Sequence, residues 1–195
     1  MDEIIKQIKD PKLLLQIERV VSFHGYLATG AFIGIQMFNI AQDVLGFQDG
    51  ERIYVTCETS NCIPDAFQIL AGATIGNNGM RIADFGKMAV VVNLQVPPGV
   101  TSARGIRIYL DPAKTEKYPK LHAWYLNAEK VPHEDVIPEL LKSGDGVYSH
   151  EIIDIAIPVR PTKCVKMCEQ CGESFVSHGD EVLCGACTRD YGGNV

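Results

Sequence analysis

Apolar residues recur along this chain with two different periods, one helical and one strand-like. In residues 11–21 the apolar positions follow a spacing of three and four, which predicts an amphipathic helix. Residues 31–45 are apolar except for one stripe of polar positions, so this second predicted helix should be buried around most of its circumference. Gly30 and Gly34 are four residues apart and would let another backbone approach closely.

The remaining periodic segments are shorter. Runs rich in Val and Ile, or alternating between apolar and polar residues, predict strands, and Pro64 suits the first turn of a helix. The expected strands are 52–56, 88–94, 105–110 and 152–159, the expected helices are 64–71 and 133–143, and residues 113–128 are expected to be irregular or to form short strands.

Composition and charge exclude several classes of protein. The chain has 195 residues and a net charge of −6, which argues against non-specific binding to nucleic acid or to anionic lipid. Residues 20–42 lack charged side chains, but they contain polar residues and glycines, so a buried helix is expected there and not a membrane span. The acidic start has no apolar run behind it, unlike a secretory signal, and a cytoplasmic protein is expected.

Side chains that could react or bind a metal lie in the stretch from Thr56 to Gly72, which runs from a predicted strand into a predicted helix. It contains the thiols of Cys57 and Cys62 and the carboxylate of Asp65. A thiol at a helix N-terminus is expected to have a lowered pKa and to be a better nucleophile or metal ligand. The alternative is that Cys62 is a small buried apolar residue beside a helix cap.

The C-terminal residues predict a metal site. Two Cys-x2-Cys pairs are separated by 12 residues, a spacing typical of one tetrahedral zinc ion held by Cys168, Cys171, Cys184 and Cys187. With four protein ligands, such a site is structural. Cys164 is a spare thiol that could replace Cys168. We therefore expect a main domain over residues 1–160 and a zinc-binding domain over residues 161–195.

The charge of the second domain bears on its partners. Residues 160–195 contain four Lys or Arg against five Asp or Glu, so there is no basic patch and nucleic acid binding is not expected. Contact with another protein, or closure over the main domain, is the expected role of the zinc-binding domain.

Three motifs resemble the E subunit of formylmethanofuran dehydrogenase and its homologues over residues 15–110. The motifs are His24-Gly25-Tyr26-Leu27-x-x-Gly30, then Cys62-x-x-Asp65-Ala66-x-Gln68-x-Leu70-x-Gly72-x-Thr74-x-Gly76, and Asp84-x-Gly86-Lys87. The four-Cys module also resembles a zinc domain attached to some members.

The resemblance implies an α+β fold with an antiparallel sheet packed by helices, a homodimer, and a treble-clef-like or zinc-ribbon-like C-terminal domain. The family commonly reads His-Gly-His-x-Cys-Pro-Gly in the first motif. Here Tyr26, Ala28 and Thr29 stand where the second His, the Cys and the Pro would be, so one imidazole and one thiol are absent.

Two hypotheses follow for function. In the first, His24 and Cys62 form a site in the main domain, either as ligands of a second metal ion or as a base and a nucleophile, with Tyr26, Asp65 and Lys87 contacting a cofactor or small-molecule ligand. The alternatives are purely structural: His24 is hydrogen-bonded to the backbone, the charge of Asp65 only interacts favourably with the helix dipole, and Lys87 is a solvated surface charge. In the second, the protein is a non-catalytic accessory subunit or interaction module of a molybdenum or tungsten enzyme.

Overall fold

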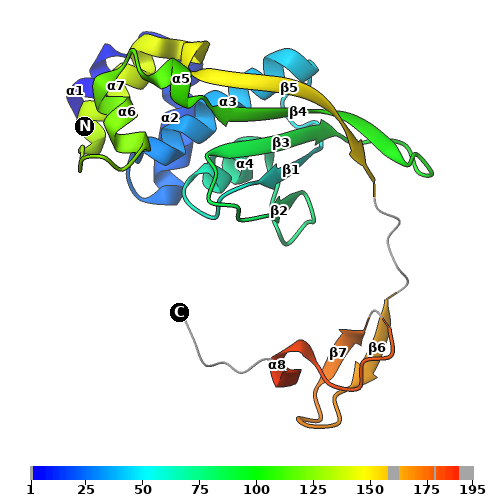
Figure 1. The fold of residues 1–195 in the computed structure, drawn as a ribbon. Helices are drawn as coiled ribbons and strands as arrows, with labels where there is room; N and C mark the ends of the chain where they lie inside the picture. Colours follow the sequence, from blue (N-terminus) through cyan, green and yellow to red (C-terminus); the bar gives the residue numbers. More distant parts are fainter. Residues whose placement is uncertain (1, 158–162, 178, 189–195) are drawn as a thin grey trace. The chain divides into compact units, whose positions relative to one another are not determined.

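The computed structural model describes residues 2–157, 163–177 and 179–188 and divides the chain into two compact units (Figure 1). The first unit, Met1–Ile157, is called the main domain below, and the second, Pro158–Val195, is called the tail. The boundary expected from the sequence, between residues 160 and 161, lies outside the described residues.

The main domain contains one five-stranded sheet in the order β2-β1-β3-β4-β5. Neighbouring strands are antiparallel except β1 and β2, which are parallel. The expected α+β fold with a mainly antiparallel sheet is therefore confirmed. The strands are β1 (Ile53–Cys57), β2 (Met80–Ile82), β3 (Ala89–Leu94), β4 (Ser102–Leu110) and β5 (Tyr148–Ala156).

Helices cover one face of this sheet and gather at one end of it (Figure 1). Helix α3 packs on β3 and β4, α4 packs on β1, and α2 packs on both of these helices. The other helices contact one another in a group. The bounds are α1 (Asp2–Gln7), α2 (Pro11–His24), α3 (Thr29–Leu45), α4 (Ile63–Ala71), α5 (Pro112–Thr115), α6 (Pro119–Tyr125), α7 (His133–Ser143) and the 3-10 helix η1 (Gly144–Val147).

Helix α3 is the centre of the core, as its sequence predicts. Most of its residues are buried, and Cys62 and α4 pack against its two glycines. A Cβ atom at Gly34 would lie 2.8 Å from the Cβ of Ala66 and 2.8 Å from the carbonyl oxygen of Ile63. Only a residue without a side chain permits this close approach.

A polar residue of α3 is buried and fully paired. The amide nitrogen of Gln36 donates to the carbonyl oxygen of Leu140 at 3.1 Å, and its amide oxygen accepts from the hydroxyl of Tyr148 at 2.7 Å. These bonds connect α3 to α7 and β5. Loss of either bond would leave a buried polar group without a partner, which is destabilising.

The expectation for residues 113–128 was wrong, because this segment forms α5 and α6. Each helix has a proline at its start, and the side chain of Asp111 accepts a hydrogen bond from the backbone N–H of Ala113 at 3.0 Å. The Asp-Pro pair that ends β4 therefore also begins a helix. Helix α1 and strand β2 were not expected from the sequence.

The tail is a small hairpin followed by a short helix. Strands β6 (Cys164–Met167) and β7 (Ser174–Ser177) are antiparallel, and α8 (Gly185–Thr188) follows them. One Cys pair lies at the turn between the strands and the other at the start of α8, an arrangement consistent with the expected treble-clef-like or zinc-ribbon-like domain.

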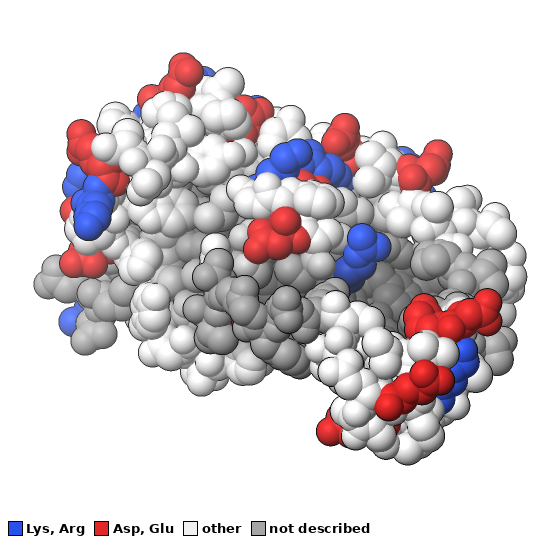
Figure 2. Space-filling view, turned by 60° about the horizontal axis from the view of Figure 1, so that its bottom comes forward, with Lys and Arg blue, Asp and Glu red and all other residues white. Residues whose placement is uncertain are grey.

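Among the described residues, no helix combines the length and the apolar character that crossing a membrane requires. On the face drawn in Figure 2, Lys and Arg side chains are interspersed with Asp and Glu side chains and do not gather into one basic surface.

Candidate functional site

The end of α2 positions an imidazole against a carboxylate of α4. His24 is the last residue of α2, and Gly25 ends the helix in the left-handed region with its N–H bonded to the carbonyl oxygen of Val21 at 2.8 Å. The Nδ1 atom of His24 lies 2.6 Å from Oδ2 of Asp65, and the two side chains are 13% and 27% exposed. Asp65 therefore does more than favour the dipole of α4.

Cys62 lies beside the same carboxylate and against the start of α3. It precedes α4 with a φ of 49°, which is unusual for a residue other than glycine. A Cβ atom at Gly30 would lie 2.9 Å from the Cβ of Cys62, so these two backbones are in close contact. Asp65 thus links the two candidate residues, because it bonds to His24 and its charge acts on Cys62.

The expected lowering of the Cys62 pKa was wrong. Burial raises the pKa of this thiol, and the negative charge of Asp65 raises it further. These effects outweigh the helix N-terminus, so Cys62 is not an activated thiolate in this arrangement. Cys57 is not an activated thiolate either, because burial raises its pKa to about 12.

Tyr26 lies close to two histidines. Its ring centroid is 5.1 Å from that of His24 and 5.8 Å from that of His133, and the residue is 53% exposed. His133 is the first residue of α7, and its Nδ1 atom lies 2.9 Å from Oγ1 and 3.3 Å from the backbone nitrogen of Thr29. We call His24, Tyr26, Cys62, Asp65 and His133 the His24 site.

His133 was missed by sequence reasoning because it is more than 100 residues from its partner. The available signal was the histidine at the start of a predicted helix, but nothing in the sequence connected that helix to the first motif. The fold makes the connection by packing α7 on α3.

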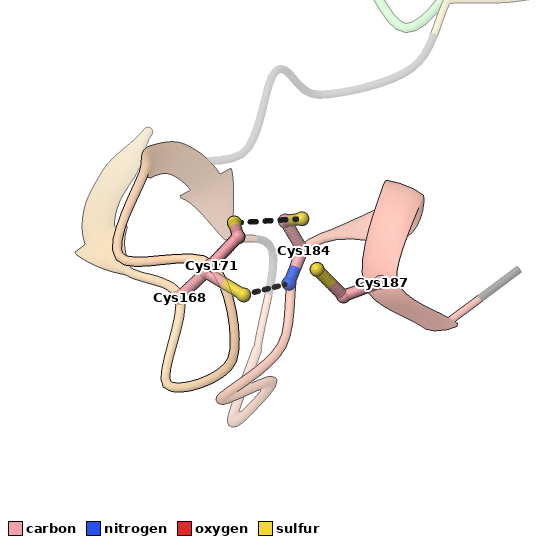
Figure 3. A group of neighbouring side chains, drawn as sticks. All are labelled: Cys168, Cys171, Cys184 and Cys187. Carbon is pink, nitrogen blue, oxygen red and sulfur yellow. Dashed lines mark hydrogen bonds between the residues drawn. The ribbon is translucent and has the colours of Figure 1, made fainter.

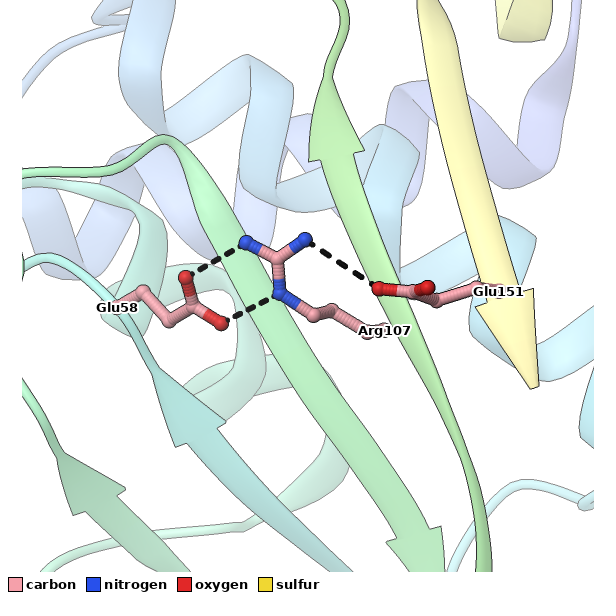
Figure 4. A network of polar contacts seen from close by, with 3 residues as sticks. All are labelled: Glu58, Arg107 and Glu151. Carbon is pink, nitrogen blue, oxygen red and sulfur yellow. Dashed lines mark hydrogen bonds and ion pairs between the residues drawn. The ribbon is translucent and has the colours of Figure 1, made fainter. Parts of the chain in front are cut away.

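Lys87 lies in a different polar network, around Glu58. The guanidinium of Arg107 donates two hydrogen bonds to Glu58, at 2.7 and 2.8 Å, and lies 3.6 Å from Glu151 (Figure 4). These bonds lower the pKa of Glu58 against the effect of burial, with smaller contributions from the charges of Arg107 and Lys87.

The backbone of Glu58 holds the motif that contains Lys87. Its carbonyl oxygen accepts hydrogen bonds from the N–H groups of Phe85 and Lys87, at 3.0 and 3.1 Å. Its own N–H donates to the carbonyl oxygen of Ala89. Asp84 accepts from the hydroxyl of Ser60 at 2.6 Å. Lys87 and Asp84 thus have structural contacts around Glu58 and Ser60, and none of these contacts includes His24.

The tail brings together the four cysteines expected to bind metal. Their sulfur atoms all lie within 4.8 Å of one another, and the Sγ atoms of Cys171 and Cys184 are 3.9 Å apart (Figure 3). Cys164 lies outside this cluster, exposed in β6 opposite Ser177. Among the described residues, this is the one group of three or more His, Cys, Asp or Glu close enough to hold a metal ion.

The sulfur atoms influence one another's protonation. Backbone N–H groups of Cys171 and Cys184 lower the pKa of Cys168 to about 6, whereas the hydrogen bond with Cys184 raises the pKa of Cys187 to about 12. Four thiolates this close repel one another unless a cation lies between them. The cluster therefore has the donor set of a metal site.

Comparison with known proteins agrees with this organisation. The family model described as FmdE, molybdenum formylmethanofuran dehydrogenase operon, matches residues 23–155. The crystal structure of a protein from Syntrophus aciditrophicus, described as like the E subunit (FmdE) of tungsten formylmethanofuran dehydrogenase, matches with a TM-score of 0.75 and 26% identity and covers 90% of this chain and 91% of that one.

A curated relative is longer than this chain. It is a probable S-adenosyl-L-methionine-binding protein of Archaeoglobus fulgidus, 26% identical over 213 residues. The match covers 97% of this chain and 56% of the relative, so the chain spans about half of that protein's length. Since the family model covers more than half of the chain, the protein belongs to the FmdE family.

Proposed function

We propose that this FmdE-family protein holds one structural zinc ion in its tail and binds a small organic ligand at the His24 site. The observation that carries the proposal is the 2.6 Å bond between His24 and Asp65. A carboxylate bonded to Nδ1 fixes the orientation of an imidazole and leaves Nε2 free to act as a base or a ligand.

The tail fits zinc by the spacing of its sulfur atoms. Zinc–sulfur bonds of about 2.3 Å in a tetrahedron separate the sulfurs by about 3.8 Å. The sulfur atoms of Cys171 and Cys184 already lie 3.9 Å apart, and the remaining sulfurs would need only a small contraction. Four thiolate ligands leave no open position on the ion, so zinc here would stabilise the tail and take no part in a reaction.

The His24 site favours an organic ligand over a second metal ion. Its side chains do not form a group of three close ligands, and the pKa of Cys62 is raised, which disfavours the thiolate that zinc requires. A metal ion at His24 and Cys62 would need ligands from elsewhere.

Metal analysis tests the choice between a ligand and a second ion. Protein saturated with zinc is dialysed and its zinc content is measured for the wild type, for His24→Ala and for a Cys168→Ser/Cys184→Ser double variant. We expect one zinc ion per chain in the first two and none in the double variant. Zinc that persists in the double variant and disappears when His24→Ala is added would instead establish a second metal site.

The relative's name supplies a first probe of ligand binding. S-adenosylmethionine is titrated by calorimetry into the wild type, His24→Ala and the distant control His150→Ala. Binding that His24→Ala weakens at least about tenfold, the value of one good charge-assisted hydrogen bond, would place that ligand at the His24 site. Binding unaffected by His24→Ala would assign it elsewhere.

A second candidate function is an accessory subunit of a molybdenum or tungsten enzyme. The description of the family supports it, and so do the apolar side chains of Val165, Met167 and Val176 on the tail hairpin, which are 68%, 63% and 46% exposed. Affinity purification from native cells distinguishes the two functions. Recovery of such an enzyme, reduced in a Val165→Ser/Met167→Ser variant, would support the accessory role, and recovery of this chain alone would count against it.

A further inference from the structure

We propose that His24 and His133 are held in opposite tautomers, so that the His24 site offers one acceptor and one donor and selects an organic ligand that carries both. The inference rests on the proposed function, since it names the ligand class of the same site. It assigns His133 as the donor of that site, a role that no sequence motif indicated.

The tautomer of His24 follows from its partner. An ionised carboxylate has only lone pairs, so the proton in the bond to Asp65 lies on Nδ1 of His24. Neutral imidazole carries one ring proton, and Nε2 of His24 is therefore a lone pair. This nitrogen accepts hydrogen bonds.

The contacts of His133 favour the opposite tautomer, with the ring proton on Nε2. A backbone N–H can only donate, and the N–H of Thr29 points to Nδ1 of His133 at 3.3 Å. Nδ1 must then be a lone pair, and the hydroxyl of Thr29, at 2.9 Å, donates to it as well. The ring proton of neutral His133 is left on Nε2, which donates hydrogen bonds.

Each imidazole is anchored by a group of a neighbouring element. Thr29 is fully buried at the first turn of α3, where its N–H has no partner within the helix. His133 supplies that partner from α7, and Asp65 holds His24 from α4. The orientation of each imidazole is thus set by an element other than its own.

A partly exposed aromatic ring lies close to both imidazoles. Tyr26 lies in contact range of both, and the two imidazoles are no further apart than the sum of the centroid distances, 5.1 and 5.8 Å. A flat ligand can contact the tyrosine ring while its polar groups reach the histidines.

Complementarity then distinguishes classes of ligand. A carboxylate or phosphate offers only acceptors and meets the lone pair of His24 and the charge of Asp65 unfavourably. A metal ion needs lone pairs from both imidazoles, and His133 presents a proton. An amide offers an N–H to His24 and a carbonyl oxygen to His133, so an amide attached to a flat ring is the simplest molecule that suits the site.

The experiment has two readouts on zinc-loaded full-length protein. First, two-dimensional NMR of nitrogen-15-labelled histidine at pH about 8, above the ordinary imidazole pKa of about 6.5, reports the ring nitrogen that carries the proton. We expect Nδ1–H for His24 and Nε2–H for His133. Thr29→Val keeps the backbone N–H and should leave the His133 tautomer unchanged. Asp65→Asn should change that of His24, because Gln68 donates to Oδ1 of residue 65 at 3.2 Å and the amide nitrogen would then face Nδ1 of His24.

Second, nicotinamide and nicotinate are titrated as a matched pair that differs only in amide against carboxylate. We expect nicotinamide to shift the His24 and His133 signals and to bind about tenfold more tightly than nicotinate, the value of one hydrogen bond lost. His122, whose Nδ1 lies 2.9 Å from Oγ1 of Thr115 on α5, is the internal control and should not respond.

The outcomes separate the two proposals. An Nδ1–H tautomer at His133, or nicotinate binding as tightly as nicotinamide, would overturn this inference while leaving a ligand site at His24 in place. Absence of Nδ1–H at His24, together with no response of its signals to either probe, would overturn the proposed function itself.

Discussion

At the scale of single residues, a few buried polar pairs determine how the helices are fixed to the sheet. The pair of Tyr148 and Gln36 is the most enclosed of them, since the tyrosine is 3% exposed and the glutamine 8%. It joins β5 to α3 across residues that are 112 positions apart. Breaking it leaves one buried polar group without a partner.

We therefore expect Tyr148→Phe to lower the free energy of unfolding by about 1–3 kcal/mol, because the amide oxygen of Gln36 loses its donor. Chemical denaturation measures the change. Tyr54→Phe, at a half-buried strand position, is the control and should differ little from the wild type. Adding Gln36→Leu to Tyr148→Phe should recover part of the loss, and no recovery would argue against an unpaired oxygen as the cause.

The network around Glu58 predicts a dependence of stability on pH. Hydrogen bonds from Arg107 are the largest cause of a Glu58 pKa below the ordinary 4.5. A carboxyl group with a lowered pKa in the folded state stabilises the fold above its unfolded pKa, and this stabilisation is lost as the pH falls below 4.5 towards the folded value.

Between about pH 6 and pH 3 the wild type should thus lose more stability than Glu58→Gln, because the amide at position 58 does not titrate while the other carboxylates titrate in both proteins. Glu151→Gln is the matched control, since its carboxylate lies 3.6 Å from Arg107 and is 57% exposed. Identical pH profiles for Glu58→Gln and the wild type would contradict the assignment.

At the scale of elements, the contact of α3 with α4 depends on glycines. Gly34→Ala would place a methyl group 2.8 Å from two atoms of α4, and overpacking of this kind costs about 1–3 kcal/mol. Thermal unfolding should show the loss. Gly146→Ala is the control, because a Cβ there meets no atom within 4 Å, and it should change stability by less than about 0.5 kcal/mol.

The same scale shows what the sequence could predict. Long periodic segments such as α2 and α3, and the Val-rich β3, are specified locally and were found. Residues 113–128 were misjudged because Tyr118, Trp124 and Tyr125 favour strands by type. Packing of α6 on α7 overrides that preference, and the Asp111 cap was understood only as the end of a strand.

The candidate sites also contain some residues that the sequence could predict and others that only the fold brings together. The four tail cysteines could be predicted because their ligand geometry follows from short spacings. His24 and Asp65 could be proposed only by motif, and their bond depends on α2 and α4 meeting in the fold. The raised pKa of Cys62 and the participation of His133 depend on burial and on contacts between distant segments, which no local pattern encodes.

At the scale of the whole molecule, the metal should stabilise one unit and not the other. Removal of the proposed zinc ion by a chelator is expected to abolish the structure of the tail, whose described residues contribute nothing to the hydrophobic core cluster, while the main domain keeps its cooperative unfolding. Calorimetry before and after chelation checks this.

Variants identify the ligands. Cys184→Ser should lose the zinc, and Cys164→Ser, which lies outside the cluster, should retain one ion per chain. Loss of zinc in Cys164→Ser with retention in Cys168→Ser would mean that the spare thiol is the ligand.

The exposed position of Cys164 has a practical consequence for the expected homodimer. During purification in air, two copies can become covalently joined through this sulfur, and the product would have the mass of a genuine dimer in gel filtration. Size measurements on this protein are therefore meaningful only with a reductant too mild to strip the zinc, or with serine at position 164.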